Sequence, residues 1–507
     1  METLVKYGST VVFFFSMIQE ERERRARLAR VRQDGEDPYP ARVRQDKTIK
    51  EFLEGFDRAL QEETPFFLTG RLRAWRKHGG LTFGTLEDGT GSVQVVCTKD
   101  MLGEETYTRL SETVDVADFL EVVGHAFLTQ KGERSLKASG YRIITKALLP
   151  LPEKWHGLTD VETRYRQRYL DLLANPSVRE IFRLRAKALQ TIRHFLDERG
   201  FLEVETPVLQ TSPGGASAEP FLTHHEALNA DMYLRVAPEL YLKRCLVGGY
   251  DRVYEVARCF RNEGIDHAHN PEFTQVEAYM AYADYEQLMG FLEQMITEVI
   301  RACGLNLAAV PFRGHVLNFT PPWPRMTFKE ALQTYAKINI EEVMTRSQAV
   351  DLAKQLKVPV EKTDSLMSIM DRIYKTHVRP KIIQPTYLYD YPVDMTPLAK
   401  RKASDPRYAE MFQLVYGAGE ENIKAFSELN DPLDQEERFA LQEQAREAGD
   451  KEAQFGDADY VTALKHGLPP TAGFGIGIDR LTALLTDASN IKEVILFPTL
   501  RPTLSDA

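Results

Sequence analysis

Gly473-Phe474-Gly475-Ile476-Gly477-Ile478-Asp479-Arg480 is the stretch of the chain that says most about its fold. Glycine alternates with large apolar residues, and a period of two is that of a β-strand, whose alternate side chains lie on opposite faces. The glycines therefore clear one face, so that a flat ligand can lie against the backbone. The spacing is not that of a dinucleotide-binding loop. Arg480 is expected to open a helix over Leu481–Asp487, placed over the cleared face; packing alone is the alternative.

A second stretch predicts two paired strands, Val253–Phe260 and Glu272–Tyr279, joined by a polar loop that starts at Arg261-Asn262-Glu263-Gly264. The period of two makes alternate residues of the second strand point together. These residues are Phe273, Gln275, Glu277 and Tyr279, and the same rule places Arg261 with Glu263. A cation, two acids and an aromatic ring suit a phosphate-bearing, cationic or adenine-containing ligand. A salt-bridged hairpin is the alternative.

The segment around these strands predicts one large α+β domain. A long amphipathic helix is expected over Val178–Arg199, followed by a short strand that stops at Pro207. Such a proline belongs on an edge strand or at a strand end. Strand-like and helical segments then alternate as far as Thr503, with a helical, lysine-rich insertion at about residues 322–384.

The N-terminal part predicts an OB-fold β-barrel. Five short alternating runs, with a helix-compatible stretch at Glu104–Glu112 after the third, have the strand order of this fold, which presents a sheet face to single-stranded nucleic acid. The runs are Phe66–Arg73, Leu81–Glu87, Ser92–Cys97, Phe119–Leu128 and Leu136–Thr145. Phe83, Gln94 and Arg71 offer a stacking ring, an amide and a cation, which suit an unpaired RNA loop. Alternatively, Phe83 belongs to the core and Gln94 to the surface.

Composition limits the class of protein. At 507 residues, with 43% hydrophobic and 27% charged residues, the chain is a multidomain globular protein without a membrane-spanning run. Its four cysteines have no CxxC spacing, which argues against a structural zinc site and a disulfide scaffold. Reduced cytosol is the default location. The net charge is −10, but six arginines between Arg22 and Arg32 form a basic run that suits RNA, or else a solvated helix face.

The first sixteen residues contain an apolar run, Val11–Phe15, that resembles the core of a signal peptide. No small-residue cleavage site follows it, and a highly charged segment comes next, so secretion is not expected. A loosely packed extension, or initiation at Met17, accounts for it better. Residues 17–32 predict a charged helix that ends before Pro38-Tyr39-Pro40.

Together these segments resemble the three signature motifs of the class II aminoacyl-tRNA synthetases, and the lysyl-tRNA synthetase family in particular, from about residue 20 to the C-terminus. The motifs that carry the resemblance are specific. They are Arg164-Tyr165-Arg166-Gln167-Arg168-Tyr169-Leu170-Asp171-Leu172, Ala237-Pro238-Glu239-Leu240-Tyr241-Leu242-Lys243-Arg244, Phe260-Arg261-Asn262-Glu263-Gly264-Ile265, His269-Asn270-Pro271-Glu272-Phe273-Thr274, Met280-Ala281-Tyr282-Ala283-Asp284-Tyr285 and Phe426-Ser427-Glu428-Leu429-Asn430-Asp431.

The resemblance implies an α+β protein in four parts: an N-terminal extension with a basic helix over residues 1–60, an OB-fold anticodon-binding domain over 61–148, a linker over 149–165 and a class II catalytic domain over 166–507. It also implies a homodimer in the cytoplasm, with Pro207 at the dimer interface. The partners would be ATP, L-lysine and tRNA(Lys), with Mg²⁺ as the cofactor and no membrane. Lysine would be activated to lysyl-adenylate and transferred to the 3′ end of the tRNA.

Roles for individual residues follow from the same resemblance. Arg261 and Arg480 would be catalytic, since adenylate formation crowds negative charge and needs cations more than an acid or base. The ATP site would comprise Arg261, Glu263, His269, Phe273, Glu421 and Arg480. The lysine site would comprise Gly215, Glu239, Glu277, Tyr279, Phe426 and Glu428, because a buried ammonium group needs carboxylates. The anticodon would be read by Phe83, Gln94 and Arg71.

Two departures from the family pattern concern the metal. Gln413 stands where the family usually has a metal-binding glutamate, whereas the second expected ligand, Glu421, is present. Lys424-Ala425 replaces the usual Asn-Gly. Lys424 places a cation near a pocket for a cation, so either activity is reduced or Lys424 points away. We expect an active enzyme with an unusually high Mg²⁺ requirement, in which Lys424 could offset part of the missing metal charge by approaching the phosphates. The alternatives are a catalytically silent tRNA-binding regulator and a lysine-activating enzyme that modifies proteins; relatives of the second kind lack the OB domain.

Overall fold

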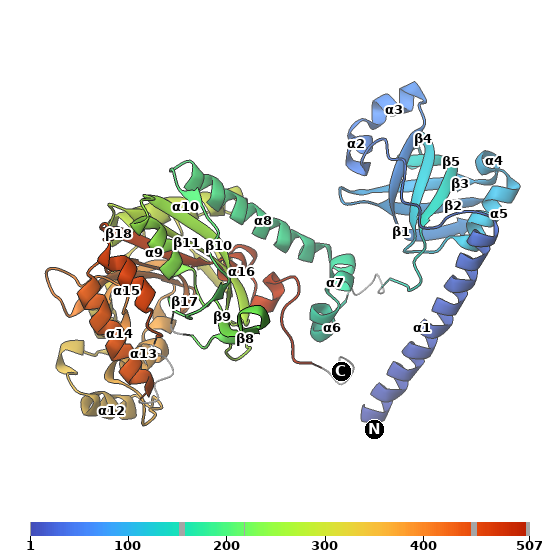
Figure 1. Ribbon diagram of the computed structural model, residues 1–507. Coiled ribbons are helices and arrows are strands. Elements are labelled where there is room, and N and C mark those ends of the chain that lie inside the picture. The colour runs from blue at the N-terminus through green and yellow to red at the C-terminus, as the bar shows by residue number, and fades with distance from the viewer. Residues whose placement is uncertain (1, 152–157, 217, 448–453, 503–507) are drawn as a thin grey trace. The chain divides into compact units, whose positions relative to one another are not determined.

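The computed structural model describes residues 2–151, 158–216, 218–447 and 454–502. The chain folds as two compact units, Met1–Thr159 and Asp160–Ala507, which Figure 1 draws in blue to cyan and in green to red. The middle of the linker expected over 149–165, residues 152–157, lies outside the described residues, as does residue 1 of the N-terminal extension.

A five-stranded barrel forms the body of the first unit, as the sequence predicts. It closes in the order β1-β2-β3-β5-β4, and two helices lie between the third and fourth strands. Its strands are β1 (Phe66–His78), β2 (Leu81–Glu87), β3 (Ser92–Thr98), β4 (Phe119–Leu128) and β5 (Arg134–Thr145), and the helices are α4 (Lys99–Leu102) and α5 (Glu104–Thr113). Side chains such as Leu72, Leu86 and Val95 alternate into a dry core because the strand period is two.

Helix α1 (Glu2–Gln33) is longer than predicted and shows how part of the basic run is used. Arg24 is buried: it pairs with Glu20 at 2.8 Å and donates a hydrogen bond of 2.9 Å to the carbonyl of Val116. Arg27 pairs with Asp115. These two arginines therefore attach the helix to the barrel, whereas Arg22 is exposed. Two short helices, α2 (Ile49–Glu54) and α3 (Phe56–Glu62), precede the barrel.

An eight-stranded sheet organises the second unit, in the order β14-β15-β16-β17-β18-β11-β10-β6. All pairings are antiparallel except the outermost ones, β14–β15 and β10–β6. The strands are β14 (Arg325–Thr327), β15 (Thr386–Pro392), β16 (Tyr408–Tyr416), β17 (Glu420–Ser427), β18 (Thr471–Gly477), β11 (Glu272–Ala281), β10 (Arg252–Phe260) and β6 (Leu202–Glu203). The last one confirms a short edge strand before Pro207, but it ends at Glu203 and not at the proline.

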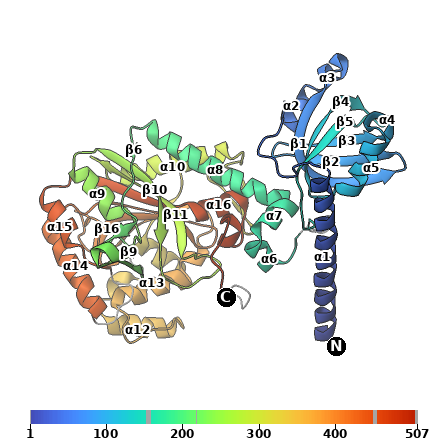
Figure 2. The ribbon, with the colours of Figure 1, turned by 45° about the vertical axis from the view of Figure 1, so that its right-hand side comes forward.

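Helices cover one face of this sheet. Side chains of α8 (Pro176–Asp197), α10 (Tyr285–Ala302) and α16 (Ile478–Thr486) pack with Phe474, Ile476 and other alternate strand residues in a single apolar cluster; α8 and α10 run along the sheet in Figure 2. The opposite face carries Gly473, Gly475 and Gly477 and is flanked by other helices. These include α9 (Glu239–Val247), α13 (Leu366–His377), α14 (Pro432–Glu447) and α15 (Ala458–Lys465).

The chain between β14 and β15 is mostly helical, where the sequence predicts an insertion. It contains α11 (Phe328–Ala331), α12 (Arg346–Gln355), α13 and the short turn η4 (Arg379–Lys381). A separate small sheet is formed by β7 (Leu209–Gln210), β9 (Ala230–Leu234) and β8 (Phe221–His225). Among the helices of the described residues, none is both long and apolar enough to cross a membrane.

Candidate active site

The glycine face of β18 forms the floor of a cavity of about 810 Å³ in the second unit. The strand register brings one row of residues across it: Gln413 on β16 is opposite Lys424 on β17, which is opposite Gly475 on β18, which is opposite Glu277 on β11. The predicted alternation of β11 is confirmed, since all four of its expected side chains line the cavity. They are Phe273, Gln275, Glu277 and Tyr279.

Two of the glycines on this floor, Gly473 and Gly475, lack a side chain for different physical reasons. A Cβ at Gly473 would overlap the carboxylate of Glu428 and the ring of Tyr279, so this position has to lack a side chain. At Gly475, a Cβ would lie 3.6 Å from Cγ of Glu277, which is an ordinary contact. Gly475 is therefore not required by packing, and its effect is to keep the floor open.

Acidic side chains gather at one end of the cavity. Glu277 accepts hydrogen bonds from Gln275 (2.6 Å) and from the hydroxyl of Tyr279 (3.0 Å). Glu239, at the start of α9, pairs with Lys243 at 2.6 Å. Glu428 also pairs with Lys243 and is fully buried, and it is not among the side chains that line the cavity. Of the six residues expected to surround lysine, Gly215, Glu239, Glu277, Tyr279 and Phe426 line it.

Burial changes the ionisation of these groups. Burial, reinforced by the neighbouring Glu239, raises the pKa of Glu277 from 4.5 to about 8. Burial also opposes the charge of Lys243, but Glu239 and Glu428 outweigh it and raise the pKa of this ammonium. Lys243 therefore stays charged and balances the charge of about one of the three acids, Glu239, Glu277 and Glu428. This end of the cavity can therefore accommodate the charge of a further cation.

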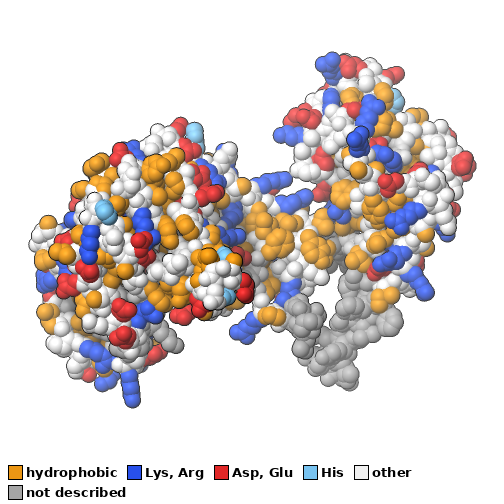
Figure 3. Space-filling model, viewed as in Figure 1, with side chains coloured by type: hydrophobic (Ala, Val, Ile, Leu, Met, Phe, Trp, Pro, Cys, Tyr) orange, Lys and Arg blue, Asp and Glu red, His pale blue; other side chains and the backbone are white. Residues whose placement is uncertain are grey.

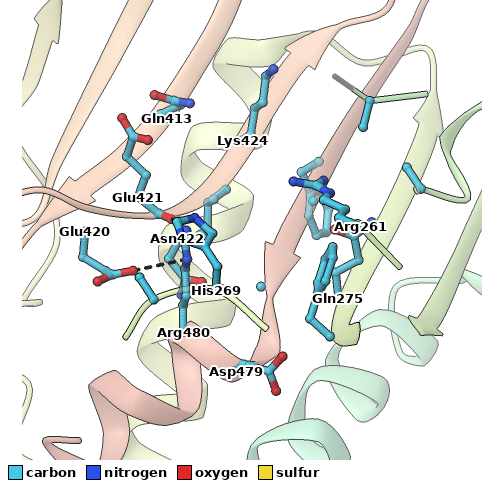
Figure 4. Close-up of a pocket in the computed structure, with 18 of the residues that line it drawn as sticks. Arg261, His269, Gln275, Gln413, Glu420, Glu421, Asn422, Lys424, Asp479 and Arg480 are labelled. Atoms are coloured by element: carbon cyan, nitrogen blue, oxygen red, sulfur yellow. Dashed lines mark hydrogen bonds and ion pairs between the residues drawn. The ribbon is translucent and has the colours of Figure 1, made fainter. Parts of the chain in front are cut away.

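Cations also line the cavity, and Figure 4 shows Arg261, Lys424 and Arg480 among its lining residues. Arg261 stands just beyond the end of β10, and its guanidinium lies 4.9 Å from the centre of the Phe273 ring. Its Nε is buried and has no hydrogen-bond partner in the described part of the chain. The expectation that Arg261 shares a strand face with Glu263 is wrong, because β10 ends at Phe260 and Glu263 is exposed in the loop.

Arg480 closes the cavity from α16. Its Nε lies 3.3 Å from Glu420, and its Nη1 donates a 2.6 Å hydrogen bond to the carbonyl of Glu421. Glu263 and His269, the other residues expected to face ATP, both line the cavity from the loop between β10 and β11. His269 is held by Asp266 at 2.9 Å.

The residues expected to hold a metal are already engaged. Glu421 pairs with Arg379 at 3.0 Å and accepts a hydrogen bond from Tyr374 (3.1 Å). The Tyr391 hydroxyl donates to Oε1 of Gln413 at 2.6 Å. Within the described ranges no cluster of three or more His, Cys, Asp or Glu side chains could hold a metal ion. One neutralised carboxylate and one occupied amide do not fit a metal held between them, since Mg²⁺ prefers anionic oxygen ligands.

Lys424 does not point away from the cavity, which was one of the two expectations for it. Its side chain is exposed to the cavity although it lies deep inside the unit. Burial lowers its pKa, and Glu239 acts in the opposite direction. Gln413, Lys424 and Glu421 lie on neighbouring strands at this side of the cavity (Figure 4).

The barrel places its three expected RNA-binding residues on one outer face. Thr85, two residues after Phe83, pairs with Gln94, and Glu87 pairs with Arg71, so the period of two puts all three on the same side. Phe83 and Gln94 are half-buried, and the inward positions between them are filled by residues such as Leu86. Phe83 is therefore not a core residue. Lys and Arg side chains are prominent on the visible face of this unit in Figure 3.

Several residues of the cavity were not predicted from the sequence. Lys243, Arg313, Arg379 and Glu420 all lie within or behind its wall, and each is fixed by an ion pair. Lys243 lies within a motif that carries the family resemblance, and its position four residues after Glu239 was a usable signal. Arg379 had none, because the inserted helical segment brings it to Glu421 from 42 residues away.

The chain belongs to the class II tRNA synthetases: the family model "tRNA synthetases class II (D, K and N)" matches residues 160–501. A second model, "OB-fold nucleic acid binding domain", matches residues 66–144. Proteins similar to this chain include several that are named lysine–tRNA ligase. One from Pelotomaculum thermopropionicum is 46% identical, over 95% of this chain and 94% of its own length. Others, from Carboxydothermus hydrogenoformans and Chloroflexus aurantiacus, are each 47% identical over 94% of this chain, and 96% and 97% of their own lengths.

Proposed function

We propose that this chain is a class II ligase that activates L-lysine with ATP and transfers it to tRNA(Lys). The observation that carries the proposal is one cavity with carboxylates at one end, cations at the other that include Arg261, unpaired among the described residues, and a bare glycine floor between them. An amino acid with a cationic side chain and a nucleotide with anionic phosphates fit these two ends. The relatives named lysine–tRNA ligase, similar over nearly the whole chain, support the same activity.

At the acidic end, Glu239 and Glu277 would receive the ammonium side chain of lysine, with Tyr279 and Phe426 around its methylene groups and Gly215 leaving space. Gly215 has a φ of +98°, which a side chain would strain. Glu428 would act through Lys243, to which it is paired. These assignments place the lysine carboxylate toward Arg261.

At the cationic end, Phe273 would stack on adenine, and Arg261 and Arg480 would hold the phosphates, with Glu263 and His269 in the covering loop. An oxygen of the lysine carboxylate bonds to the α-phosphorus, the bond from that phosphorus to the bridging oxygen breaks, and pyrophosphate leaves with the electron pair. The cations stabilise the charge that gathers during this step. A hydroxyl of the tRNA 3′ end then attacks the carbonyl carbon, and AMP leaves.

The barrel would bind the anticodon loop through Phe83, Gln94 and Arg71. This domain would comprise residues 61–148, as expected from the sequence.

We also infer that the protein is a homodimer in the cytoplasm, where tRNA is charged. Several apolar side chains between residues 202 and 228, the segment that contains Pro207, are exposed, which supports a subunit interface because exposed apolar surface marks interaction sites. They are Leu202, Val208, Leu209, Leu222 and Leu228.

Lysine-dependent ATP–pyrophosphate exchange tests the first half-reaction, and lysylation of tRNA(Lys) tests the second. Exchange that needs lysine, together with charging, is the expected result. Exchange without charging would favour the protein-modifying alternative. Binding of tRNA without exchange at any Mg²⁺ concentration would favour the silent regulator.

Mg²⁺ is proposed here only as the companion of the ATP phosphates, because Gln413 and Glu421, the ligands expected from the sequence, do not fit a metal held between them. Gln413→Glu adds the carboxylate that the site lacks, so we expect this variant to reach half-maximal exchange at a lower Mg²⁺ concentration. The Mg²⁺ dependence of exchange in the two proteins is the measurement. Superimposable curves would show that position 413 does not contact the metal.

A further inference from the structure

Lys424 is a cation without a partner in a cavity whose other cations are mostly paired. Arg313 and Arg480 pair with Glu420, Arg379 pairs with Glu421, and Lys375 pairs with Asp371 at 2.5 Å. Lys424 makes no ion pair or hydrogen bond within the described residues, although its side chain is exposed to the cavity. An ammonium group held inside a protein without a counter-charge is unfavourable, so its position indicates an anionic ligand.

The surroundings of Lys424 say where that anion lies. Gly475, its neighbour on β18, has no side chain, and Gln413, its neighbour on β16, is neutral and held by Tyr391. The space before Lys424 is thus the glycine floor, which on its other side reaches Arg261, the second cation without an ion pair. The acids that act on Lys424 are each paired with another cation: Glu239 with Lys243, Glu421 with Arg379 and Asp371 with Lys375. Because each of these acids already has a cationic partner, none of them forms an ion pair with Lys424.

We propose that Lys424 binds the α-phosphate of the adenine nucleotide from the side opposite Arg261, and so supplies there positive charge that does not depend on a divalent metal. The proposal rests on the proposed function, since it deepens the ATP site of the same cavity. It also accounts for the poor fit of Gln413 and Glu421 to a metal ion. The Lys424 ammonium group would balance the negative charge of the phosphate at this side. Arg379 neutralises Glu421, the carboxylate that would otherwise attract a metal ion.

AMP is the probe for this proposal because its only phosphate is the α-phosphate, and adenosine is the matching probe without it. The affinities of both are measured by calorimetry on the full-length protein in EDTA, for wild type, Lys424→Met, Lys424→Arg and the control Lys354→Met. Lys354 is a surface lysine whose side chain is 72% exposed. Charge-assisted hydrogen bonds to phosphate predict that wild type prefers AMP over adenosine, and that Lys424→Met loses about tenfold of that preference. Lys424→Arg retains it, and Lys354→Met does not change it.

The same measurement with ATP, in EDTA and in Mg²⁺, tests the metal part. Removal of Mg²⁺ is expected to weaken ATP binding more in Lys424→Met than in wild type. An unchanged preference for AMP in Lys424→Met overturns the proposal. If Lys424→Met instead weakens binding of lysine alone and leaves AMP unaffected, Lys424 faces the amino-acid carboxylate and the proposal is also overturned. If the wild-type protein binds neither AMP, ATP nor adenosine, the proposed function fails. This outcome is distinct from a failure of the Lys424 proposal, in which wild type binds nucleotide and Lys424→Met keeps the same preference for AMP.

Discussion

Glu277 shows at the scale of a single residue how a site for a cation is held ready at a cost in stability. Its pKa is about 8 in the folded chain and 4.5 ordinarily, so between these values the native state keeps a proton that the unfolded state releases. Stability from this group is complete below pH 4.5 and falls as the pH rises toward 8. A bound ammonium group favours the ionised form, so lysine binding below pH 8 should release a proton.

Glu277→Gln removes this titration and the negative charge together. We expect lysine-dependent exchange to be abolished, since loss of one partner of a buried charge pair costs roughly 3–5 kcal/mol. The melting temperature of the variant should exceed that of wild type by more at pH 8 than at pH 5. Thermal unfolding at the two pH values and exchange at pH 8 are the measurements. Glu239→Gln should also abolish exchange; unchanged exchange in both variants would contradict the lysine-site assignment.

The glycines of β18 give a second test at the residue scale, because they differ in what a methyl group would meet. Gly473→Ala forces Glu428 and Tyr279 to move, and overpacking of this kind costs about 1–3 kcal/mol. Gly475→Ala makes only ordinary contacts, so its stability should stay within about 0.5 kcal/mol of wild type, while ATP binds more weakly over the narrowed floor. Chemical denaturation and ATP binding separate the two; equal destabilisation would contradict the different roles.

At the scale of elements, the outer face of β1, β2 and β3 belongs to the first unit, whereas the chemistry proposed at β18 belongs to the second. Phe83→Ala removes a stacking platform worth about 1–3 kcal/mol per base, so we expect slower lysylation of tRNA and an unchanged rate of pyrophosphate exchange. Both rates are measured on the same preparation. Thr85→Ala, on the same face, is the matched control and should leave charging nearly unchanged. A loss of exchange in Phe83→Ala would show that the barrel face influences adenylate formation.

For the whole molecule, two units with separate cores predict two unfolding transitions. Leu86 is fully buried in the barrel cluster, and Leu86→Ala should cost about 2–5 kcal/mol in that unit. Calorimetry should show one transition lowered and the other unmoved, and added lysine with ATP should raise only the second. A single transition that shifts as a whole in Leu86→Ala would mean that the two units unfold together.

Local periodicity accounts for what the sequence alone determined. Alternation with a period of two predicted β2 and β4 to the residue and placed Phe273, Gln275, Glu277 and Tyr279 on one face of β11. The alternating glycines of β18 predicted a bare strand face, and the order of strands and helix predicted the barrel. These signals depend on neighbours in the chain, so a single sequence contains them.

The tertiary structure alone decided which charges are free. Lys243 satisfies Glu239 and Glu428, which are 189 residues apart, and Arg379 reaches Glu421 from an inserted segment. Gln413, the neighbour of Lys424 on β16, already accepts a hydrogen bond from Tyr391. Lys424 therefore has no partner within the described residues and lies beside the glycine floor. Local patterns show that a charged residue lies on a given face, but its partners are set by long-range packing. For this reason the sequence predicted the cavity, and only the fold showed which of its cations can bind an anion.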